Sequence, residues 1–408
     1  MAWYKGNLHM HSYWSEGHNF PEMVADWFKC AGYDFIAFTE HDRHQTGEKW
    51  VSCDLARGSG RSMKEGNLLQ KYIQRFGASW VETRAEGEGA VRVKPLAEYR
   101  HLVEEAGQFL VMTGEEVTTT WGDVQDGSQT HWINVFNTPE AVAPQHDPEV
   151  SERAMQATLH AARSQGISSG SEVLVFLNHP NFGWNATAES IAAVKDLRHI
   201  EIYTALNMCN TFGDERHCCV ERIWDVALTL RLDNGGDLLY GLATDDCHTY
   251  AHHWELGDTA LPGRAWICVQ AHWLTPEHIL GAVNRGNYYC SSGVELDEIV
   301  MDKEGITLAI NAREGVRYTT QFIGSPLGVD TSSEAVRDSD GFEIRTTRVY
   351  SKEIGQVLHE TTDLKPAYTF TGNECYVRAV VRSDVVHPNP TGPKDYEMAW
   401  TQPVVPGR

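Results

Sequence analysis

The sequence predicts an α/β fold, in which helices surround a parallel sheet or barrel, followed by a smaller all-β domain. Short apolar runs alternate with amphipathic helical segments over roughly residues 1–290, which is typical of strands buried on both faces. Polar side chains gather where these runs end, as they do at the mouth of a parallel barrel. Beyond Gly293 the helical segments stop, and short strand-like runs separated by turn residues indicate a sandwich.

The first unit of this pattern, residues 7–42, reads as strand, loop, helix and strand. PEMVADWFKCAGY has helical spacing, with Pro21 at its first turn and Gly32 at its end. A buried strand follows over residues 34–39 and leads into the polar sequence EHD. The pattern then repeats, with strands expected at residues 109–114, 131–137, 173–181, 200–205 and 238–248, and helices at 96–108, 152–166, 188–199 and 221–235.

The chain, at 408 residues, is longer than one typical domain, so two domains are expected. Residues 1–293 would form the barrel domain. Within it, residues 43–95 are rich in Gly, Arg, Glu and Lys, and they read as an insertion that is a candidate lid over the mouth. Residues 294–408 would form the β-rich domain, with strands at 296–301, 306–311, 342–350, 375–382 and 397–403.

Composition narrows the class of partner. The formal net charge of −22 argues against a nucleic-acid backbone as the main partner, and no apolar run approaches the ~18 residues of a membrane helix. Nine scattered cysteines without a CxxC motif indicate free thiols in a reducing compartment. The start MAWYKGN shows no signal peptide, so a cytoplasmic protein with a small-molecule substrate is expected, although a removed signal would leave the same start. The oligomeric state is left open.

A metal site is indicated by the stretch NLHMHSYWSEGH. His9 and His11 would share one face of a strand, because strand side chains alternate, and two imidazoles on one face can bind one ion. HxH alone is a weak signal, and ordinary packing is the alternative. Imidazole together with carboxylate suits zinc, manganese or iron better than calcium or magnesium. Further ligand-type residues stand at predicted strand ends: His41, Glu116, His131, His179, Asp246 and His248.

Taken together, the motifs NLHMHSYWSEG, FTEHD, TGEEV, NHP and DDCH resemble the PHP (polymerase and histidinol phosphatase) superfamily over roughly residues 1–290. Within that superfamily, WYKGNLHMHS, RGNYYCSSG and a β-rich tail with AWTQP resemble the branch that includes the carbaryl hydrolases. The resemblance implies a distorted (β/α)7 PHP barrel with a C-terminal sandwich-like domain. It also implies a di- or trinuclear site for two or three divalent ions of manganese, zinc or iron.

The resemblance also implies the ligands of each ion. Glu116 would bridge the first two ions, and Glu115 beside it is the less favoured neighbour. The family usually has Asp or His where this chain has Glu16, which makes the third ion the least certain. Both Asp245 and Asp246 are available, and Asp246 is preferred for its DxH spacing. The three implied sets are His9, His11, Glu116 and Asp246; Glu116, His131 and His179; and Glu16, His41 and His248.

The function expected from these residues is a metal-dependent hydrolase in which a metal-bound hydroxide attacks a phosphoester of a small organic molecule. Asp246, His248 and Arg43 are the candidate catalytic residues, although Arg43 could equally be an exposed loop arginine. The alternative reaction is hydrolysis of a carbamate, ester or amide, as in the carbaryl hydrolases. Four tryptophans flank the ligands and could form an aromatic wall for an organic substrate, or simply pack: Trp14, Trp121, Trp132 and Trp184. A non-catalytic, metal-dependent binding module is the second alternative.

Overall fold

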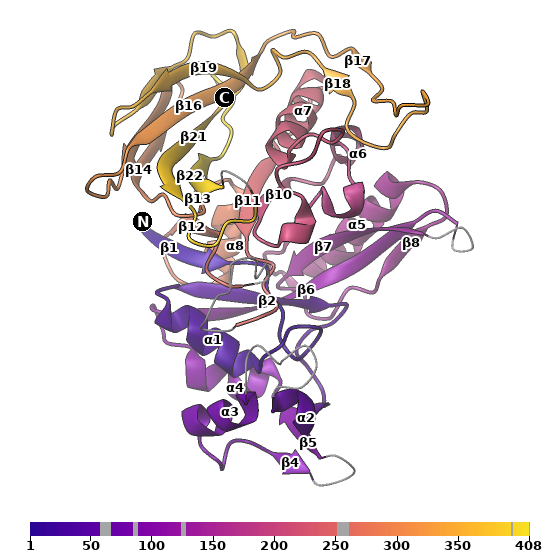
Figure 1. Ribbon diagram of the computed structural model, residues 1–408, viewed down its shortest axis with the longest axis vertical. Helices are drawn as coiled ribbons and strands as arrows, with labels where there is room; N and C mark the ends of the chain where they lie inside the picture. Colours follow the sequence, from indigo (N-terminus) through magenta and orange to yellow (C-terminus); the bar gives the residue numbers. More distant parts are fainter. Residues whose placement is uncertain (58–66, 85–88, 124–127, 251–260, 393–394, 408) are drawn as a thin grey trace.

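The computed structural model describes residues 1–57, 67–84, 89–123, 128–250, 261–392 and 395–407, and shows a mixed α/β fold (Figure 1). One large mixed sheet of 14 strands runs through the molecule. Its strands, in order across the sheet, are β11 (Tyr240–Thr244), β10 (His199–Thr204), β9 (Leu174–Leu177), β7 (Gln129–Phe136), β6 (Leu110–Trp121), β2 (Phe35–His41), β1 (Ala2–Asn7), β12 (Trp266–Ala271), β13 (Tyr288–Ser291), β22 (Tyr396–Thr401), β21 (Glu374–Val386), β16 (Tyr318–Pro326) and β19 (Gln356–Thr361), with β8 (Gln145–Asp147) beside β6.

The prediction of a parallel sheet is wrong for two strands. β1, β2 and β6 are parallel, as are β9, β10 and β11, but β7 is antiparallel to both of its neighbours and β12 is antiparallel to β1. Because β7 runs the other way, its first residues lie beside the last residues of β6, with His131 opposite Thr119. The reversal thus brings His131 to the end of the sheet where β2 and β6 finish.

Two distant parts of the chain meet just beyond the ends of β1 and β11. Met10 and Cys247 form an isolated parallel bridge. The His11 N–H donates to the Cys247 carbonyl at 3.0 Å, and the Asp246 N–H donates to the His9 carbonyl at 3.1 Å. These bonds join the two outer strands of the run from β11 to β1. A closed seven-stranded barrel built from that run remains a prediction.

The helices pack their apolar side chains against this sheet. Pro21 begins α1 and Pro276 begins α8, at the first turn, where the missing N–H has no helical partner to lose. Two predicted helices are shorter than expected, because the chain becomes extended at Glu104 and Val194. No helix in the described ranges is both long and apolar enough to cross a bilayer. The helices of this part are α1 (Pro21–Cys30), α4 (Leu96–Val103), α5 (Ser151–Ser169), α6 (Ala188–Ala193), α7 (Val220–Asp233) and α8 (Pro276–Asn284).

The described part of the insertion is folded, with an apolar core of its own. Tyr72 stacks on Phe20 with ring centroids 4.1 Å apart, and Trp14 is buried in the same core. The insertion therefore packs directly on the loop that follows the first two histidines and carries Trp14 and Phe20. Its elements are β3 (Lys49–Ser52), α2 (Cys53–Ala56), α3 (Leu68–Phe76), β4 (Thr83–Arg84) and β5 (Ala90–Val93).

Glu22 in α1 is buried against the insertion. Tyr72 Oη donates to Glu22 Oε1 at 2.6 Å, and Trp80 Nε1 donates to the same oxygen at 3.0 Å. Burial raises the pKa of Glu22 to about 7, although these two donors and the nearby charge of Lys94 oppose the shift. The carboxyl group therefore keeps its proton in the folded protein at pH values where the unfolded chain has released it.

Glu22→Gln is expected to stabilise the protein over the wild type at neutral pH but not at acid pH. As the pH rises from about 4.5 to about 7, the wild type should lose on the order of 3 kcal/mol of unfolding free energy, because only its unfolded state ionises. Gln accepts the same two hydrogen bonds and does not titrate. Urea unfolding of both proteins at about pH 5 and pH 8 measures the difference. An equal difference at the two pH values would contradict a protonated Glu22.

The C-terminal residues continue the large sheet, since β13 pairs with β22 and β22 with β21. Arg378 in β21 and Asp225 in α7, both buried, form an ion pair at 2.8 Å, and Tyr376 Oη donates to Asp225 at 2.7 Å.

The predicted strand at 342–350 is wrong, because only Val349–Tyr350 (β18) forms a strand there, and it pairs with β17 (Ser333–Glu334). The boundary between residues 293 and 294 stays a prediction. A second sheet comprises β14 (Leu296–Met301), β15 (Gly305–Ile310) and β20 (Ala367–Thr369).

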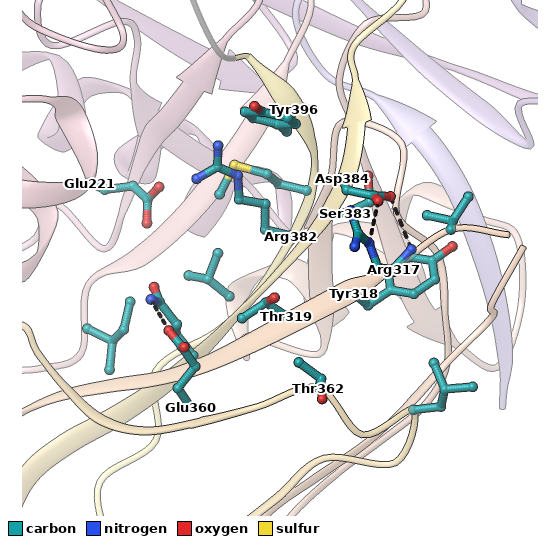
Figure 2. Close-up of a pocket in the computed structure, with 16 residues that line it drawn as sticks. Glu221, Arg317, Tyr318, Thr319, Glu360, Thr362, Arg382, Ser383, Asp384 and Tyr396 are labelled. Atoms are coloured by element: carbon teal, nitrogen blue, oxygen red, sulfur yellow. Dashed lines mark hydrogen bonds and ion pairs between the residues drawn. The ribbon is translucent and has the colours of Figure 1, made fainter.

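A hollow of about 1020 Å³ lies on the C-terminal strands, with Glu221 of α7 on one side (Figure 2). Arg382 covers the ring of Tyr396 at 4.0 Å from its centroid, and Arg317 pairs with Asp384. None of the described residues that line this hollow is a predicted site residue. The chemistry indicated by the sequence therefore lies elsewhere, at the end of the sheet where β1 and β11 meet.

Candidate metal centre

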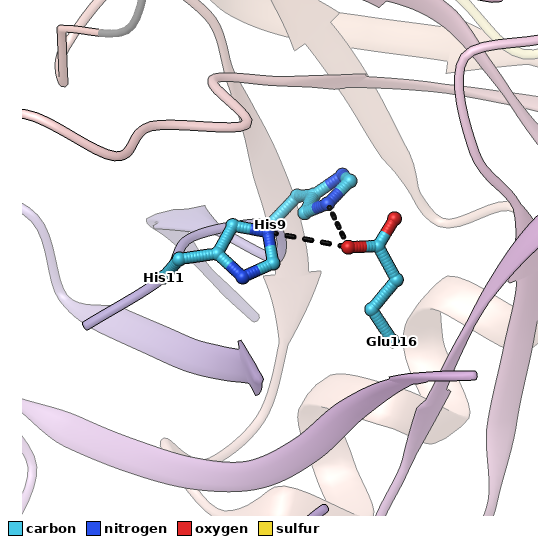
Figure 3. A group of neighbouring side chains, drawn as sticks. All are labelled: His9, His11 and Glu116. Carbon is cyan, nitrogen blue, oxygen red and sulfur yellow. Dashed lines mark ion pairs between the residues drawn. The ribbon is translucent and has the colours of Figure 1, made fainter. Parts of the chain in front are cut away.

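His9 and His11 lie side by side, fully buried, just after β1 (Figure 3). Met10 between them points into the core, so the alternation expected for an HxH pair holds although the two histidines lie beyond the strand. Their ring centroids are 5.4 Å apart. Their Nε2 atoms face one oxygen of Glu116, which lies 3.5 Å from His9 and 3.2 Å from His11.

Glu116 is the carboxylate on which the imidazoles converge. Besides the first two histidines, His41 Nε2 lies 3.4 Å from Glu116 Oε2, and His179 Nε2 lies 3.4 Å from Glu116 Oε1. Asn178 Nδ2 donates to Oε1 at 2.7 Å and fixes the carboxylate. The sequence analysis placed Glu116 at the end of a strand. In the structure Glu116 lies inside β6, because this strand continues to Trp121. The neighbouring Glu115 points away and accepts the Val142 N–H.

Asp246, and not Asp245, faces this cluster. Asp246 Oδ1 lies 3.3 Å from His9 Nε2 and 3.4 Å from His11 Nε2. The Asp245 carboxylate instead accepts three backbone N–H groups of residues 263–265 at 2.7 to 2.8 Å, and burial raises its pKa to about 6. Asp246 has a φ of 50°, a left-handed backbone that Asp adopts more readily than most residues. The DxH spacing favoured Asp246 over Asp245, and Asp246 is the one that faces His9 and His11. Its role as a metal ligand stays a prediction.

A third group of predicted ligands lies at the mouth of the cluster. Glu16 Oε1 is 3.0 Å from His41 Nε2 and 3.0 Å from His248 Nε2. The Glu16 side chain is about half exposed, and hydrogen bonds from His248 and then His41 lower its pKa well below the usual range. Glu16 thus lies beside His41 and His248, the two residues with which it was predicted to hold a third ion, and that ligand role stays a prediction.

His131 is a predicted ligand that belongs to none of the close groups of potential ligands among the described residues and lines neither hollow over them. Its ring stacks on Trp121 at 4.1 Å, and its Nε2 atom is buried without a hydrogen-bond partner among the described residues. Burial lowers the pKa of His131 to about 3, and the charges of Arg345 and His179 add to that effect, so the imidazole is neutral. Close sets of three potential ligands exist among the described residues at His9, His11 and Glu116; at His9, His179 and Asp246; and at His11, Asp246 and His248.

The donor set fits a metal cation. The Nε2 atoms of His9, His11 and His131 are buried and make no hydrogen bond within the described chain, and an unsatisfied buried nitrogen is costly. Burial alone would lower the pKa of His11, but Asp246 and Glu116 outweigh burial and raise that pKa to about 10. The same carboxylates raise the pKa of His9 well above its usual value. The site therefore stabilises positive charge at the point where the ring nitrogens meet.

Glu201 in β10 is an important residue that the sequence analysis missed. It is fully buried, and its Oε1 lies 2.7 Å from His9 Nδ1. Its other bonds come from the Thr244 and Thr204 hydroxyls at 2.7 Å and from the His179 N–H at 2.8 Å. A carboxylate that accepts the Nδ1 proton leaves Nε2 of His9 unprotonated and aimed at the cluster. Glu201 therefore orients two of the predicted ligands at once.

Glu201→Gln is expected to weaken zinc binding by about 10- to 100-fold, as is usual when the partner of a metal-binding histidine is changed. Gln has the same size, but its NH₂ group would face two of the four donors that the carboxylate now accepts. Competition with a chromophoric chelator measures the zinc affinity. Glu298→Gln, at an exposed carboxylate in β14, is the control. Equal affinities in the two variants would contradict this role for Glu201.

A second carboxylate, Glu40, holds the loop that carries His11. It accepts hydrogen bonds from the hydroxyls of Ser12 and Ser15 and, at 2.7 Å, from Gln45 Nε2. The Ser15 Oγ also lies 3.2 Å from His11 Nδ1. Since Ser15 donates its proton to Glu40, its oxygen can accept the Nδ1 proton of His11, so that Nε2 is the nitrogen that would bind a metal ion, as in His9.

Two adjoining hollows open over the cluster, with volumes of about 420 Å³ and about 600 Å³. The first lies over the cluster itself, and its apolar side is formed by Leu206 and Met208. The second contains Arg43, the predicted catalytic arginine, together with Lys49, which the sequence analysis did not select. The two hollows share Glu16, His41, Trp132 and Phe182 as lining residues, so they form one continuous space.

Comparison with known proteins gives little beyond the geometry. No protein-family model and no curated protein matches the chain. Among solved structures, the chain is similar to a two-domain protein from Bacteroides vulgatus ATCC 8482 that contains a predicted PHP-like metal-dependent phosphoesterase. The two are 14% identical, the match covers 99% of this chain and 95% of that chain, and the TM-score is 0.37. A likeness of this degree carries no conclusion about the activity of this chain.

Proposed function

We propose that this protein is a metal-dependent hydrolase, built on a PHP-like barrel, that acts on a phosphoester of a small organic molecule. The observation that carries this proposal is the convergence of imidazole nitrogens on Glu116 and Asp246 at 3.2 to 3.5 Å, inside a hollow open to the surface. About two or three ions of manganese, zinc or iron, held by the predicted ligands, would supply Lewis-acid chemistry that stabilises charge developing on a phosphoryl group.

The protein's own side chains would contribute orientation, proton placement and exclusion of water. Glu201 and Ser15 set the tautomers of His9 and His11, as their contacts at Nδ1 indicate. His248 Nδ1 lies 3.0 Å from the Asp246 carbonyl oxygen and donates to it, which directs its Nε2 toward the mouth. Asp246 and His248 are therefore our candidates for holding the reacting group and for exchanging a proton with it.

The second candidate is hydrolysis of a carbamate or ester of an apolar molecule. It is compatible with the lining of the site, because Trp132, Phe182, Leu206 and Met208 form a wall of apolar side chains beside the cluster. Such a wall suits an aromatic or aliphatic group of the substrate under either reaction. The two candidates therefore differ in the bond that is cleaved and not in the shape of the site.

The test uses protein purified without chelator and reconstituted with manganese, zinc or iron. We expect about two or three metal equivalents per chain, and metal-dependent hydrolysis of p-nitrophenyl phosphate or bis-p-nitrophenyl phosphate that a chelator abolishes. Turnover of an aryl carbamate alone would select the second candidate. Metal binding without turnover of any of the three would instead support a binding module. Fewer than about one equivalent after reconstitution would exclude the metal centre.

A further inference from the structure

Two cations, Arg43 and Lys49, line the outer of the two hollows, and Arg43 is exposed. Neither cation lines the inner hollow, where Glu116, His179 and Asp246 are found. Glu16 and His41 line both hollows, so a molecule that reaches the cluster and the two cations must extend past this pair.

The two cations lack carboxylate partners in the described parts of the chain. Arg43 makes no ion pair or side-chain hydrogen bond there, and Lys49 uses one of its three protons on the Trp14 carbonyl at 2.6 Å. Burial lowers the pKa of Lys49, the positive charge of Arg43 lowers it further, and the charge of Glu40 opposes the shift. The Glu40 carboxylate accepts hydrogen bonds from Ser12, Ser15 and Gln45 and makes no ion pair with either cation in the described chain.

The chain has 56 acidic and 34 basic residues, yet no carboxylate of the described chain forms an ion pair with Arg43 or Lys49. An anion bound by both cations would supply that partner through charge-assisted hydrogen bonds. The space between this pair and the cluster is lined by Trp132 and Phe182, whose rings meet edge to face at 5.1 Å between centroids. The two hollows together therefore offer three features to one molecule: a place for an anion at Arg43 and Lys49, an aromatic wall, and the candidate metal centre.

We infer that the substrate is an organic phosphoester that carries a second anionic group, a carboxylate or a phosphate, which binds Arg43 and Lys49 while the scissile phosphoester lies at the cluster. This inference rests on the proposed function and names its substrate class. The organic part between the two anionic groups would lie against Trp132 and Phe182. Arg43 and Lys49 then determine specificity through the remote group, not through the reacting phosphorus.

The test compares 4-carboxyphenyl phosphate with phenyl phosphate in the manganese-loaded enzyme. The wild type should prefer the carboxylated substrate in kcat/KM, and Arg43→Gln and Lys49→Met should each lower that preference about 10-fold, mainly through KM. Arg57→Gln, at an exposed arginine of the same insertion, is the control and should keep the wild-type preference. An equal loss for both substrates in the two variants would overturn the inference, because the cations would then act on the shared phosphate.

Binding separates this inference from the proposed reaction. Calorimetry with 4-carboxyphenylphosphonate and phenylphosphonate, neither of which can be hydrolysed as an ester, should show the same preference in the wild type and its loss in Arg43→Gln and Lys49→Met. That binding pattern without turnover of any phosphoester would support the anion site at Arg43 and Lys49 and exclude the proposed function. Turnover of both phosphates with no preference in the wild type would support the proposed function and exclude that anion site.

Discussion

The double substitution His9→Ala/His11→Ala should reduce metal-dependent hydrolysis by about a thousandfold or more, since no side chain replaces the Lewis acid that these residues would hold. Both imidazoles are fully buried and face Glu116 and Asp246, so their loss removes two of four predicted ligands of one ion. Elemental analysis should show less metal per chain. The thermal stabilisation that added metal gives the wild type should shrink, because binding to the folded state is what produces it.

His101→Ala/His160→Ala is the matched control, because both of these histidines are exposed, in α4 and α5. Surface substitutions usually change stability by less than about 0.5 kcal/mol, so this control should keep metal and activity. Circular dichroism should show that the first double variant keeps its secondary structure, since the apolar core does not depend on the ions. Wild-type turnover and metal content in that variant would exclude the metal centre altogether.

Glu116→Gln should cost about as much activity as the double histidine change, whereas Glu115→Gln should cost little. Glu116 faces the imidazoles of His9, His11, His41 and His179, so an amide in its place loses the charge that would bridge two ions. Burial raises the pKa of Glu115 to about 8, so this residue is already neutral at pH 7. The second change therefore exchanges one neutral group for another.

The two adjacent Glu→Gln variants control for each other, because they alter the same strand in the same way. Activity and bound metal should be measured for both at pH 7, where only Glu116 is charged. The stability advantage of Glu115→Gln over the wild type should grow as the pH rises from about 4.5 toward 8, because over that range Glu115 ionises in the unfolded wild type but keeps its proton in the folded protein. Equal losses of metal from the two variants would mean that Glu116 is not the bridging residue.

The alternation of side chains along the chain predicted which neighbouring residues face the cluster, because side-chain direction over two or three residues depends only on local backbone geometry. Alternation placed His9 and His11 on one side and Met10 on the other, even though the strand itself ends at Asn7. The same reasoning selected Asp246 over Asp245. These inferences needed only the direction of side chains over two or three residues.

The direction of β7 was missed because β6 is longer than its apolar run. The sequence indicated a strand that ends at residue 114, which leaves room for a crossover before residue 131. In the structure β6 continues to Trp121 and β7 begins at Gln129, and seven intervening residues are fewer than the roughly dozen that a parallel crossover needs. The polar stretch EEVTTT hid the continuation, since a strand that carries ligands is not uniformly apolar.

Glu201 and Lys49 show two different limits of local reasoning. Glu201 did leave a signal: a lone carboxylate inside HIEIYT must find donors, because an unpaired buried charge is prohibitively costly. Lys49 left none, because its position beside Arg43 depends on how the insertion packs over the loop at Trp14. Long-range packing of that kind has no periodic trace in the chain.

During synthesis, β1 cannot pair with β12, and Met10 cannot form its bridge with Cys247, until these later parts of the chain have been made. At roughly 5–20 residues per second, on the order of 10–50 s pass between the emergence of His9 from the ribosome and that of Asp246. Throughout that interval one edge of β1 has no partner, and an open strand edge invites pairing with other nascent chains. We therefore expect late closure of this kind to slow assembly and to leave the growing polypeptide open to aggregation.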